Sequence, residues 1–145
     1  MANTWGVTPR QSVAAECERR GVGAVVAGCI DLLEGRGADD TLIVALGGPA
    51  AENVLAGREG GKGGYWPRVW AARGLLYAWS DDAEPAIIRA TADEAWRVRE
   101  MAAKVIARHR VGGALAAVAA LNHDPIPRVK SAADRAVMLL SAARA

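Results

Sequence analysis

The chain has 145 residues, a length that fits one domain or one short repeat array and that is long enough to bury a core. Just over half of the residues are apolar, and the aromatic residues are five Trp and two Tyr without any Phe, so the composition favours helices packed through small side chains over an aromatic-rich β core. A net charge of +2 is too small to indicate a nucleic-acid partner by itself, and a basic surface has to be argued from residue positions.

Neither secretion nor membrane spanning is expected from the sequence. The first residues lack the basic-then-apolar pattern of a secretion signal. The apolar runs are far shorter than the ~20 residues needed to cross a bilayer. Cys17 and Cys29 fall in segments expected to be buried helix, which favours reduced core thiols over a disulfide. We therefore expect a cytoplasmic protein without a membrane partner.

The first third of the chain is expected to be helical. A Thr-Pro-Arg-Gln sequence that starts at Thr8 has the pattern of a capping box, so a helix should begin there and run to about Arg20. Residues 24–34 carry apolar side chains at helical spacing and predict a second, buried helix. Residues 41–46 are interpreted as a third helix, because a lone strand would have no partner in this chain.

A helix over residues 49–55 precedes a glycine-rich segment, residues 57–64. Five of its eight residues are glycine, which no packed element tolerates, so we expect a mobile loop. The segment resembles a phosphate-binding loop only superficially, because Gly63 and not a hydroxyl residue follows Lys62. A flexible connector is the favoured interpretation. The next helix is predicted from Tyr65 or Trp66 to about Trp79.

The last third of the chain contains two copies of one unit, which begin at Asp93 and at Asp124. The offset between these two aspartates is named here the repeat spacing. In each copy the Asp is followed by Arg-Val-Arg or Arg-Val-Lys and then by small residues, so that Val98 and Val129 hold equivalent positions. A weaker copy upstream places Val69 at a similar spacing before Val98. Self-similarity at this period indicates a stacked helical repeat.

Each unit is predicted to pair a short helix with a long one. The short helices are expected at about residues 84–92 and 114–121. We expect Asp93 to cap a long helix that runs to about Arg110, and Asp124-Pro125 to open the last helix with proline at its first position. No segment alternates with a period of two over a useful length, so the chain is predicted to be all-α.

These units resemble HEAT-type repeats, in the short variety also found in phycobiliprotein-lyase-like proteins, over roughly residues 83–143. The resemblance implies an α-α superhelix, a HEAT-like α-solenoid of antiparallel helix pairs that tends to bind macromolecules. It also implies that Asp93, Arg99, Asp124 and Lys130 are structural residues that cap helices and bond neighbouring units. We expect one domain over residues 1–145, with capping helices in 1–48 and repeat units in 49–145. Whether the first third caps the array or binds a partner stays open.

Basic residues recur seven apart on the long helix and again on the last helix. Stacked units should bring equivalent residues into rows across neighbouring helices. Such a surface can bind phosphates or an acidic protein. The alternative is a solvated face with local ion pairs, for which Glu100 is well placed. The candidates, named here the basic row, are Arg68, Arg97, Lys104, Arg108, Arg128 and Arg135.

Other candidate sites are fewer. Trp66 is the aromatic candidate, because it adjoins the glycine-rich loop, while the other aromatic residues of the middle third are expected in the core. His109 and His123 lack the spacing of a metal site, and we expect no metal and no other cofactor. No motif of nucleophilic or zinc-dependent catalysis occurs in the sequence, so we expect a protein that is not an enzyme.

The expected function is therefore a non-catalytic binding scaffold or regulatory adaptor, whose groove between second helices binds another protein. The alternative is a nucleic-acid-binding module that uses the basic row, and a DNA-repair relative is one form of this alternative. Five contacts to duplex phosphates predict a salt slope of about −4.5, from ~0.9 per contact. A lyase-like chaperone of a cofactor is a third hypothesis, and it rests on the repeat family alone.

Overall fold

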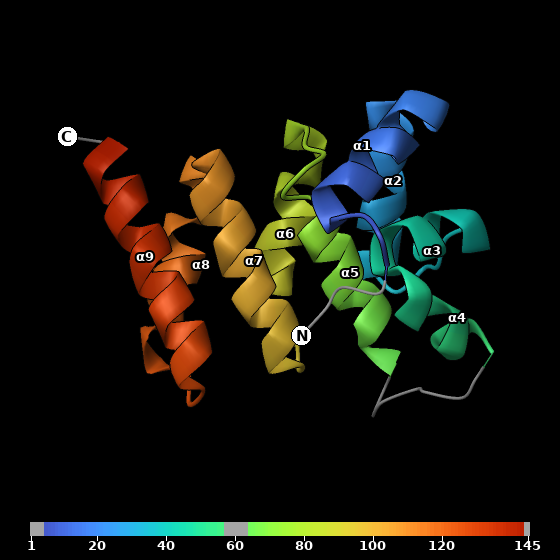
Figure 1. Ribbon diagram of the computed structural model, residues 1–145. Helices are drawn as coiled ribbons and strands as arrows, with labels where there is room; N and C mark the ends of the chain where they lie inside the picture. Colours follow the sequence, from blue (N-terminus) through green and yellow to red (C-terminus); the bar gives the residue numbers. More distant parts are fainter. Residues whose placement is uncertain (1–4, 57–63, 144–145) are drawn as a thin grey trace. The chain divides into compact units, whose positions relative to one another are not determined.

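The computed structural model describes residues 5–56 and 64–143 (Figure 1). Every regular element in these residues is a helix and none is a strand, which confirms the all-α prediction. The chain forms two compact units, Met1–Ser80 and Asp81–Ala145. The glycine-rich loop predicted over 57–64 lies, except for Gly64, outside the described residues.

The first unit begins as the sequence predicts. The Thr8 hydroxyl accepts a hydrogen bond from the Gln11 amide at 3.1 Å, and the Gln11 side chain accepts one from the Thr8 amide at 2.9 Å. This capping box satisfies two amides that have no partner inside the helix. The segment predicted at 41–46 is a helix, as expected. The helices of this unit are α1 (Pro9–Arg20), α2 (Val22–Leu33), α3 (Asp40–Gly47), α4 (Pro49–Leu55) and α5 (Trp66–Gly74).

The core of the first unit depends on close approach of helices. Helix α2 packs against α5, and α3 packs against α1, α4 and α5. A Cβ atom added to Gly47 on α3 would lie 2.5 Å from the Trp70 ring of α5. Cys29 is fully buried in this core, where burial raises the pKa of its thiol to about 12. Both cysteines are free thiols, as the sequence predicted, but only Cys29 is a core residue, because Cys17 is partly exposed.

The prediction of a helix to about Trp79 is wrong, because α5 ends at Gly74. The chain continues in tight turns, in which the Leu76 amide donates to the Arg73 carbonyl and the Tyr77 amide donates to the Gly74 carbonyl, each at 3.0 Å. Gly74 has no room for a side chain, since an added Cβ would lie 2.6 Å from Leu46. Apolar residues continue past Gly74, so the apolar spacing of this segment did not reveal where the helix ends.

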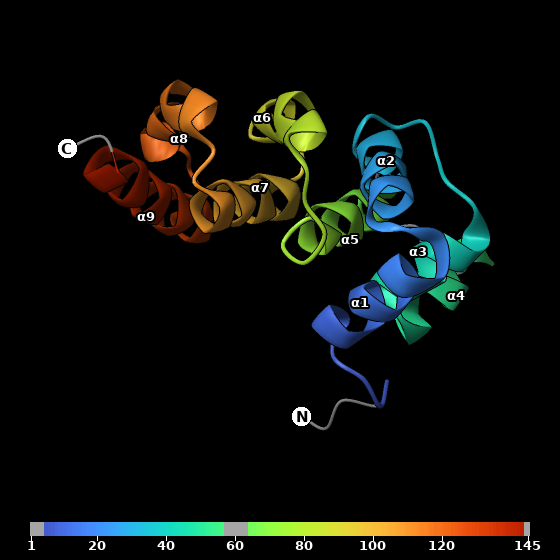
Figure 2. The same ribbon diagram turned by 90° about the horizontal axis from the view of Figure 1, so that it is seen from above.

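The second unit consists of two helical hairpins. Helix α6 packs on α7, α8 packs on α9, and α7 packs along α9. Figure 2 shows α6 and α8 on one side of this unit and α7 and α9 on the other. The elements are α6 (Glu84–Ala90), α7 (Trp96–His109), α8 (Leu115–Ala120) and α9 (Pro127–Ala143), with 3-10 turns at Asp81–Ala83, Gly112–Ala114 and Leu121–His123.

The two long helices of this unit begin in the same way. The Asp93 carboxylate accepts a hydrogen bond from the Ala95 amide at 2.8 Å, and the Asp124 carboxylate accepts one from the Ile126 amide at 3.0 Å. Each Asp therefore forms a turn with the amide two residues further on. The helix starts at the next residue in both cases.

The sequence misplaced these helix starts slightly. The residue that caps α7 is Ala95 and not Asp93, and Pro127 rather than Pro125 is the first residue of α9. The reason is that an Asp can bond the amide two residues away while its own backbone still lies before the helix. Asp93 and Asp124 therefore support the helix starts from outside the helices.

The repeat spacing also holds in the core of the second unit. Val98 and Val129 are both 0% exposed, and so are Ala102 and Ala133. The amides of both valines donate to the carbonyl three residues earlier, at 3.0 Å in each case. The two copies thus share their turn, their helix start and their buried face. Whether the hairpins continue into a superhelix stays a prediction.

Candidate binding groove between α7 and α9

Arg99 joins the two repeat copies. Its guanidinium donates to the Asp124 carboxylate at 2.7 Å and 3.2 Å, and to the Asp93 carbonyl at 2.9 Å. The Asp124 side chain is only 5% exposed, and hydrogen bonding from Arg99 lowers the pKa of its carboxyl. Lys130, the equivalent of Arg99 on α9, is exposed and has no ion-pair partner in the described part of the chain. Arg99 and Asp124 are well explained as structural residues.

An open hollow of about 380 Å³ lies between α7 and α9. The two helices run side by side in the second unit (Figures 1 and 2). One face of each helix lines the hollow. The lining residues are four positions apart on α7 and three or four positions apart on α9, as expected for residues on one face of a helix. This surface is named here the α7–α9 groove, and its lining residues are Glu100, Lys104, Pro127, Arg128, Ser131, Ala132 and Arg135.

A nearly buried carboxylate organises the groove. Glu100 on α7 is 7% exposed, and Arg128 on α9 donates to its two oxygens at 2.9 Å and 3.1 Å. Lys104 lies on the same face of α7, with its Nζ 3.6 Å from a Glu100 oxygen. A two-point pair of this kind fixes the orientation of the guanidinium as well as its position.

Trp96 provides a second support for the same guanidinium. The Arg128 guanidinium carbon lies 5.1 Å from the centroid of the Trp96 ring, and that of Arg97 lies 4.4 Å from it. Both distances are within the range of cation–π attraction. Arg128 is therefore held by a carboxylate and an aromatic ring, both of which belong to the preceding repeat copy.

Part of the positive charge of the groove is not compensated. Arg135 is exposed and makes no ion pair within the described ranges, and Lys104 pairs only with Glu100. Arg128 directs its Nε and Nη2 to Glu100, which leaves its Nη1 for another acceptor. Three cations and a single carboxylate line the hollow, so its local charge is positive.

The groove brings together three members of the basic row: Lys104, Arg128 and Arg135. Arg97 lies nearby on the Trp96 ring, whereas Arg108 is an exposed residue of α7 that does not line the hollow. Arg68 belongs to α5 in the first unit, so its alignment with Arg97 stays a prediction.

Trp66, the aromatic candidate, is the first residue of α5 and lies in an aromatic cluster. Its ring centroid is 5.1 Å from that of Tyr65 and 6.4 Å from that of Trp70, on which it is stacked. Trp66 is half-buried, whereas Trp70 is 5% exposed and belongs to the core. The cluster explains the position of Trp66 without a ligand.

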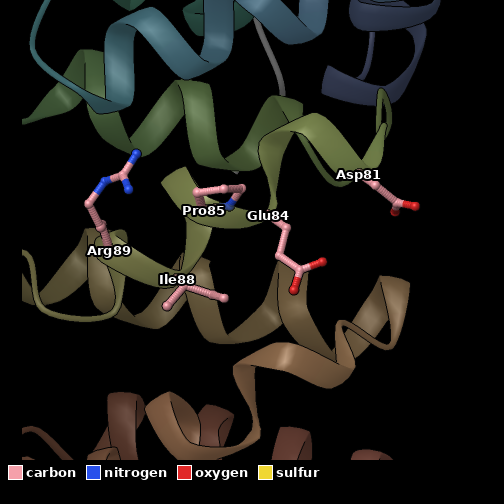
Figure 3. A pocket seen from close by; sticks show the side chains of 5 residues that line it. All are labelled: Asp81, Glu84, Pro85, Ile88 and Arg89. Atoms are coloured by element: carbon pink, nitrogen blue, oxygen red, sulfur yellow. The ribbon is translucent and has the colours of Figure 1, made fainter.

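A second open hollow, of about 500 Å³, lies along α6 (Figure 3). In this view Arg89 and Asp81 stand at opposite ends, with Pro85, Ile88 and Glu84 between them. One short helix and the turn before it supply all these residues. Two carboxylates, one guanidinium and two apolar side chains form no set that would select one ligand charge. The α7–α9 groove is the better candidate.

We did not predict the closest ion-pair partner of Glu100 from the sequence. It indicated Glu100 as a partner for basic residues of its own helix, but the closest pair is with Arg128 on the neighbouring helix. The repeat itself held the signal. Arg128 is the equivalent of Arg97, so it should lie beside Arg97 and within one helical turn of Glu100. Ser131 gave no such signal, because it replaces Glu100 in the second copy.

The structure thus defines an all-helical protein with a basic groove between two equivalent helices. Within residues 5–56 and 64–143, no three His, Cys, Asp or Glu side chains gather as metal ligands would, and no helix is long and apolar enough to cross a bilayer. Neither a protein-family model, nor a curated protein, nor a solved structure matches the chain.

Proposed function

We propose that the protein is a non-catalytic binding scaffold of the HEAT-like solenoid type, and that the α7–α9 groove binds an acidic segment of a partner protein. The observation that carries this proposal is the hollow between equivalent helices, lined by Lys104, Arg128 and Arg135 with one carboxylate. The recurrence of turns and buried valines at the repeat spacing supports the solenoid. Stacked repeats present such grooves to their partners.

The size and charge of the groove favour a protein over a nucleic acid. A hollow of about 380 Å³ accommodates a few side chains, whereas duplex DNA needs an extended track of phosphate contacts. Glu100 stands among the cations and engages Arg128 at two points, which reduces the attraction for a polyanion. An acidic side chain needs only a few hydrogen-bond donors, and Lys104, Arg135 and the Nη1 of Arg128 provide them.

A nucleic-acid partner is the second candidate, because basic residues recur at the repeat spacing in Arg97 and Arg128 and again in Lys104 and Arg135. Electrophoretic shift of a duplex oligonucleotide at two salt concentrations tests it. With the three basic residues that line the groove as contacts, log K should fall with log salt at a slope of about −2.7, from ~0.9 per contact. Absence of a salt-sensitive shift at micromolar protein would remove this candidate.

Site-specific cross-linking in the cells that make the protein tests the main proposal. A photoreactive amino acid replaces Ser131 inside the groove or, as the matched control, Asp134, an exposed residue of the same helix that does not line the hollow. We expect a discrete protein adduct at Ser131 and none at Asp134, and loss of the adduct in Lys104→Ala/Arg135→Ala. Equal labelling at both positions, or an adduct that nuclease removes, would contradict the proposal.

A further inference from the structure

The donors that remain available in the α7–α9 groove have an unusual geometry. The Nε and Nη2 edge of the Arg128 guanidinium, one of its two edges that match a planar carboxylate, already holds Glu100. The remaining donors are the Arg128 Nη1 with the second hydrogen of Nη2, the Lys104 ammonium, the Arg135 guanidinium and the Ser131 hydroxyl. These groups come from two helices and reach the hollow as separate donors. Such a set suits an anion whose oxygens point in several directions.

The charge of the groove matches the same kind of anion. The three cations, less the charge of Glu100, leave two positive charges around the hollow. A phosphorylated serine or threonine carries about −1.5 to −2 at neutral pH on three strongly accepting oxygens. A carboxylate carries one charge on two oxygens and would use fewer of the donors. Charge and donor number thus both favour a phosphate monoester.

We propose that the α7–α9 groove recognises a phosphorylated serine or threonine in the partner protein, which specifies the ligand of the binding function proposed above and rests on it. Lys104 and Arg135 contact the phosphate, and Ser131 donates a hydroxyl hydrogen bond. Arg128 contributes its free Nη1 and is positioned by Glu100 and the Trp96 ring. Clusters of this type read phosphate through charge-assisted hydrogen bonds.

Three biotinylated peptide pools test the proposal. Each pool has a fixed central residue, which is phosphoserine, serine or glutamate, between random positions, and retention on the immobilised full-length protein is measured. Two or three charge-assisted bonds predict at least about tenfold stronger retention of the phosphoserine pool than of the serine pool. The glutamate pool should fall between them. A duplex oligonucleotide at equal phosphate concentration should not displace the phosphoserine pool.

Two double variants separate the groove from general surface charge. Lys104→Ala/Arg135→Ala should lower the preference for phosphoserine to about unity. The matched control, Arg36→Ala/Lys130→Ala, removes the same charge from exposed residues outside the groove and should keep the preference. All four side chains are exposed, so thermal melting should confirm that both variants are folded.

Each failure has a distinct meaning. Equal retention of the phosphoserine and serine pools, or a preference that survives in Lys104→Ala/Arg135→Ala, would overturn the phosphate assignment and leave protein binding in the groove intact if the Ser131 cross-link forms. Displacement by duplex DNA would overturn both. Retention of neither pool would also overturn the phosphate assignment, and the cross-linking result would then decide the proposed function by itself.

The role of Glu100 gives a separate readout. Glu100→Gln keeps the shape of the side chain but leaves a third positive charge uncompensated and weakens the pair with Arg128, because an amide offers one oxygen acceptor in place of two. We expect stronger retention of every acidic pool and of duplex DNA, with a smaller ratio of phosphoserine to glutamate retention. A purely structural Glu100 would instead leave that ratio unchanged.

Discussion

Both compact units of this protein are built from helices in the described residues, but different kinds of contact stabilise the interior of each unit. In the second unit, turns, helix starts and buried valines recur at the repeat spacing, and Arg99 of one copy binds Asp124 of the next. In the first unit, helices meet where glycine removes the side chain, as at Gly47 and Gly74. Repetition leaves a pattern in the sequence, whereas a single close contact does not.

The largest effect is expected in the first unit, from Gly47→Ala. The added Cβ would lie 2.5 to 2.8 Å from three atoms of the Trp70 ring, which is rigid and 5% exposed. Since neither the ring nor the backbone can move easily, we expect a loss of about 3 kcal/mol in the free energy of unfolding. Denaturant titration measures it.

Gly23→Ala is the matched control for that variant. Gly23 lies near the start of α2, and a Cβ added there meets no atom within 4 Å. Alanine is the better helix former, so stability should stay the same or rise slightly. If Gly47→Ala were as harmless as Gly23→Ala, close approach would not explain the packing of the first unit.

The repeat predicts equal effects in the second unit for Val98→Ala and Val129→Ala. Both valines are 0% exposed and occupy equivalent positions. Truncation of either removes two buried methylene-sized groups and leaves a cavity, which should cost about 2 kcal/mol. Thermal or denaturant unfolding of the two variants gives the comparison. If the losses in free energy of unfolding differed by more than about 1 kcal/mol, equivalent positions in the two copies would not contribute equally to stability.

A smaller effect is expected from Asp124→Asn, which should lower the free energy of unfolding by about 1.5 kcal/mol at neutral pH. The mostly buried Arg99 loses its counter-charge in this variant. The side-chain oxygen of asparagine can still accept the hydrogen bond from the Ile126 backbone amide. Because Arg99 lowers the pKa of Asp124 in the folded state, this stabilisation is present above the ordinary value of 3.8 and is lost as the pH falls below it. The difference in free energy of unfolding between the wild type and the variant should therefore become smaller as the pH falls below about 4. A constant gap would contradict the ion pair as its cause.

The smallest effect is expected from Asp39→Asn in the first unit. Arg20 lowers the pKa of Asp39 to about 2, yet the Asp39 side chain is 55% exposed, and solvent screens the pair. Asparagine can also replace Asp39 as the cap of α3. The unfolding midpoint should stay within the error of the measurement at neutral pH. If Asp39→Asn lowered the free energy of unfolding as much as Asp124→Asn, the exposed pair of the first unit would stabilise the protein as much as the buried pair of the second, which would contradict this account.

The sequence predicted helices well where a local signal existed. The capping box at Thr8 and the proline at Pro49 marked helix starts that the structure confirms. The end of α5 at Gly74 was missed, because apolar residues continue along the turns that follow it and no proline or polar cap marks the end in the sequence. Helix starts in the second unit were misplaced slightly, because an Asp can support a helix from two residues before its cap.

The candidate groove was predictable only in part. The spacing of Lys104 and Arg135 indicated that equivalent cations would lie on neighbouring helices, and both line the groove. The same repeat indicated that Arg128, as the equivalent of Arg97, would lie near Glu100, but the two-point geometry of their pair depends on how α7 and α9 pack. Ser131 could not be found, since a lone serine on a helix face carries no pattern.

Chemical-shift mapping of the isotopically labelled full-length protein tests the central claim most directly. The phosphoserine peptide that is retained best is titrated into the protein, and backbone amide shifts are followed along the chain. The account predicts that the largest shifts cluster at residues 100–104 and 128–135 and disappear in Lys104→Ala/Arg135→Ala. Shifts concentrated in residues 5–80, or unchanged in that variant, would contradict it.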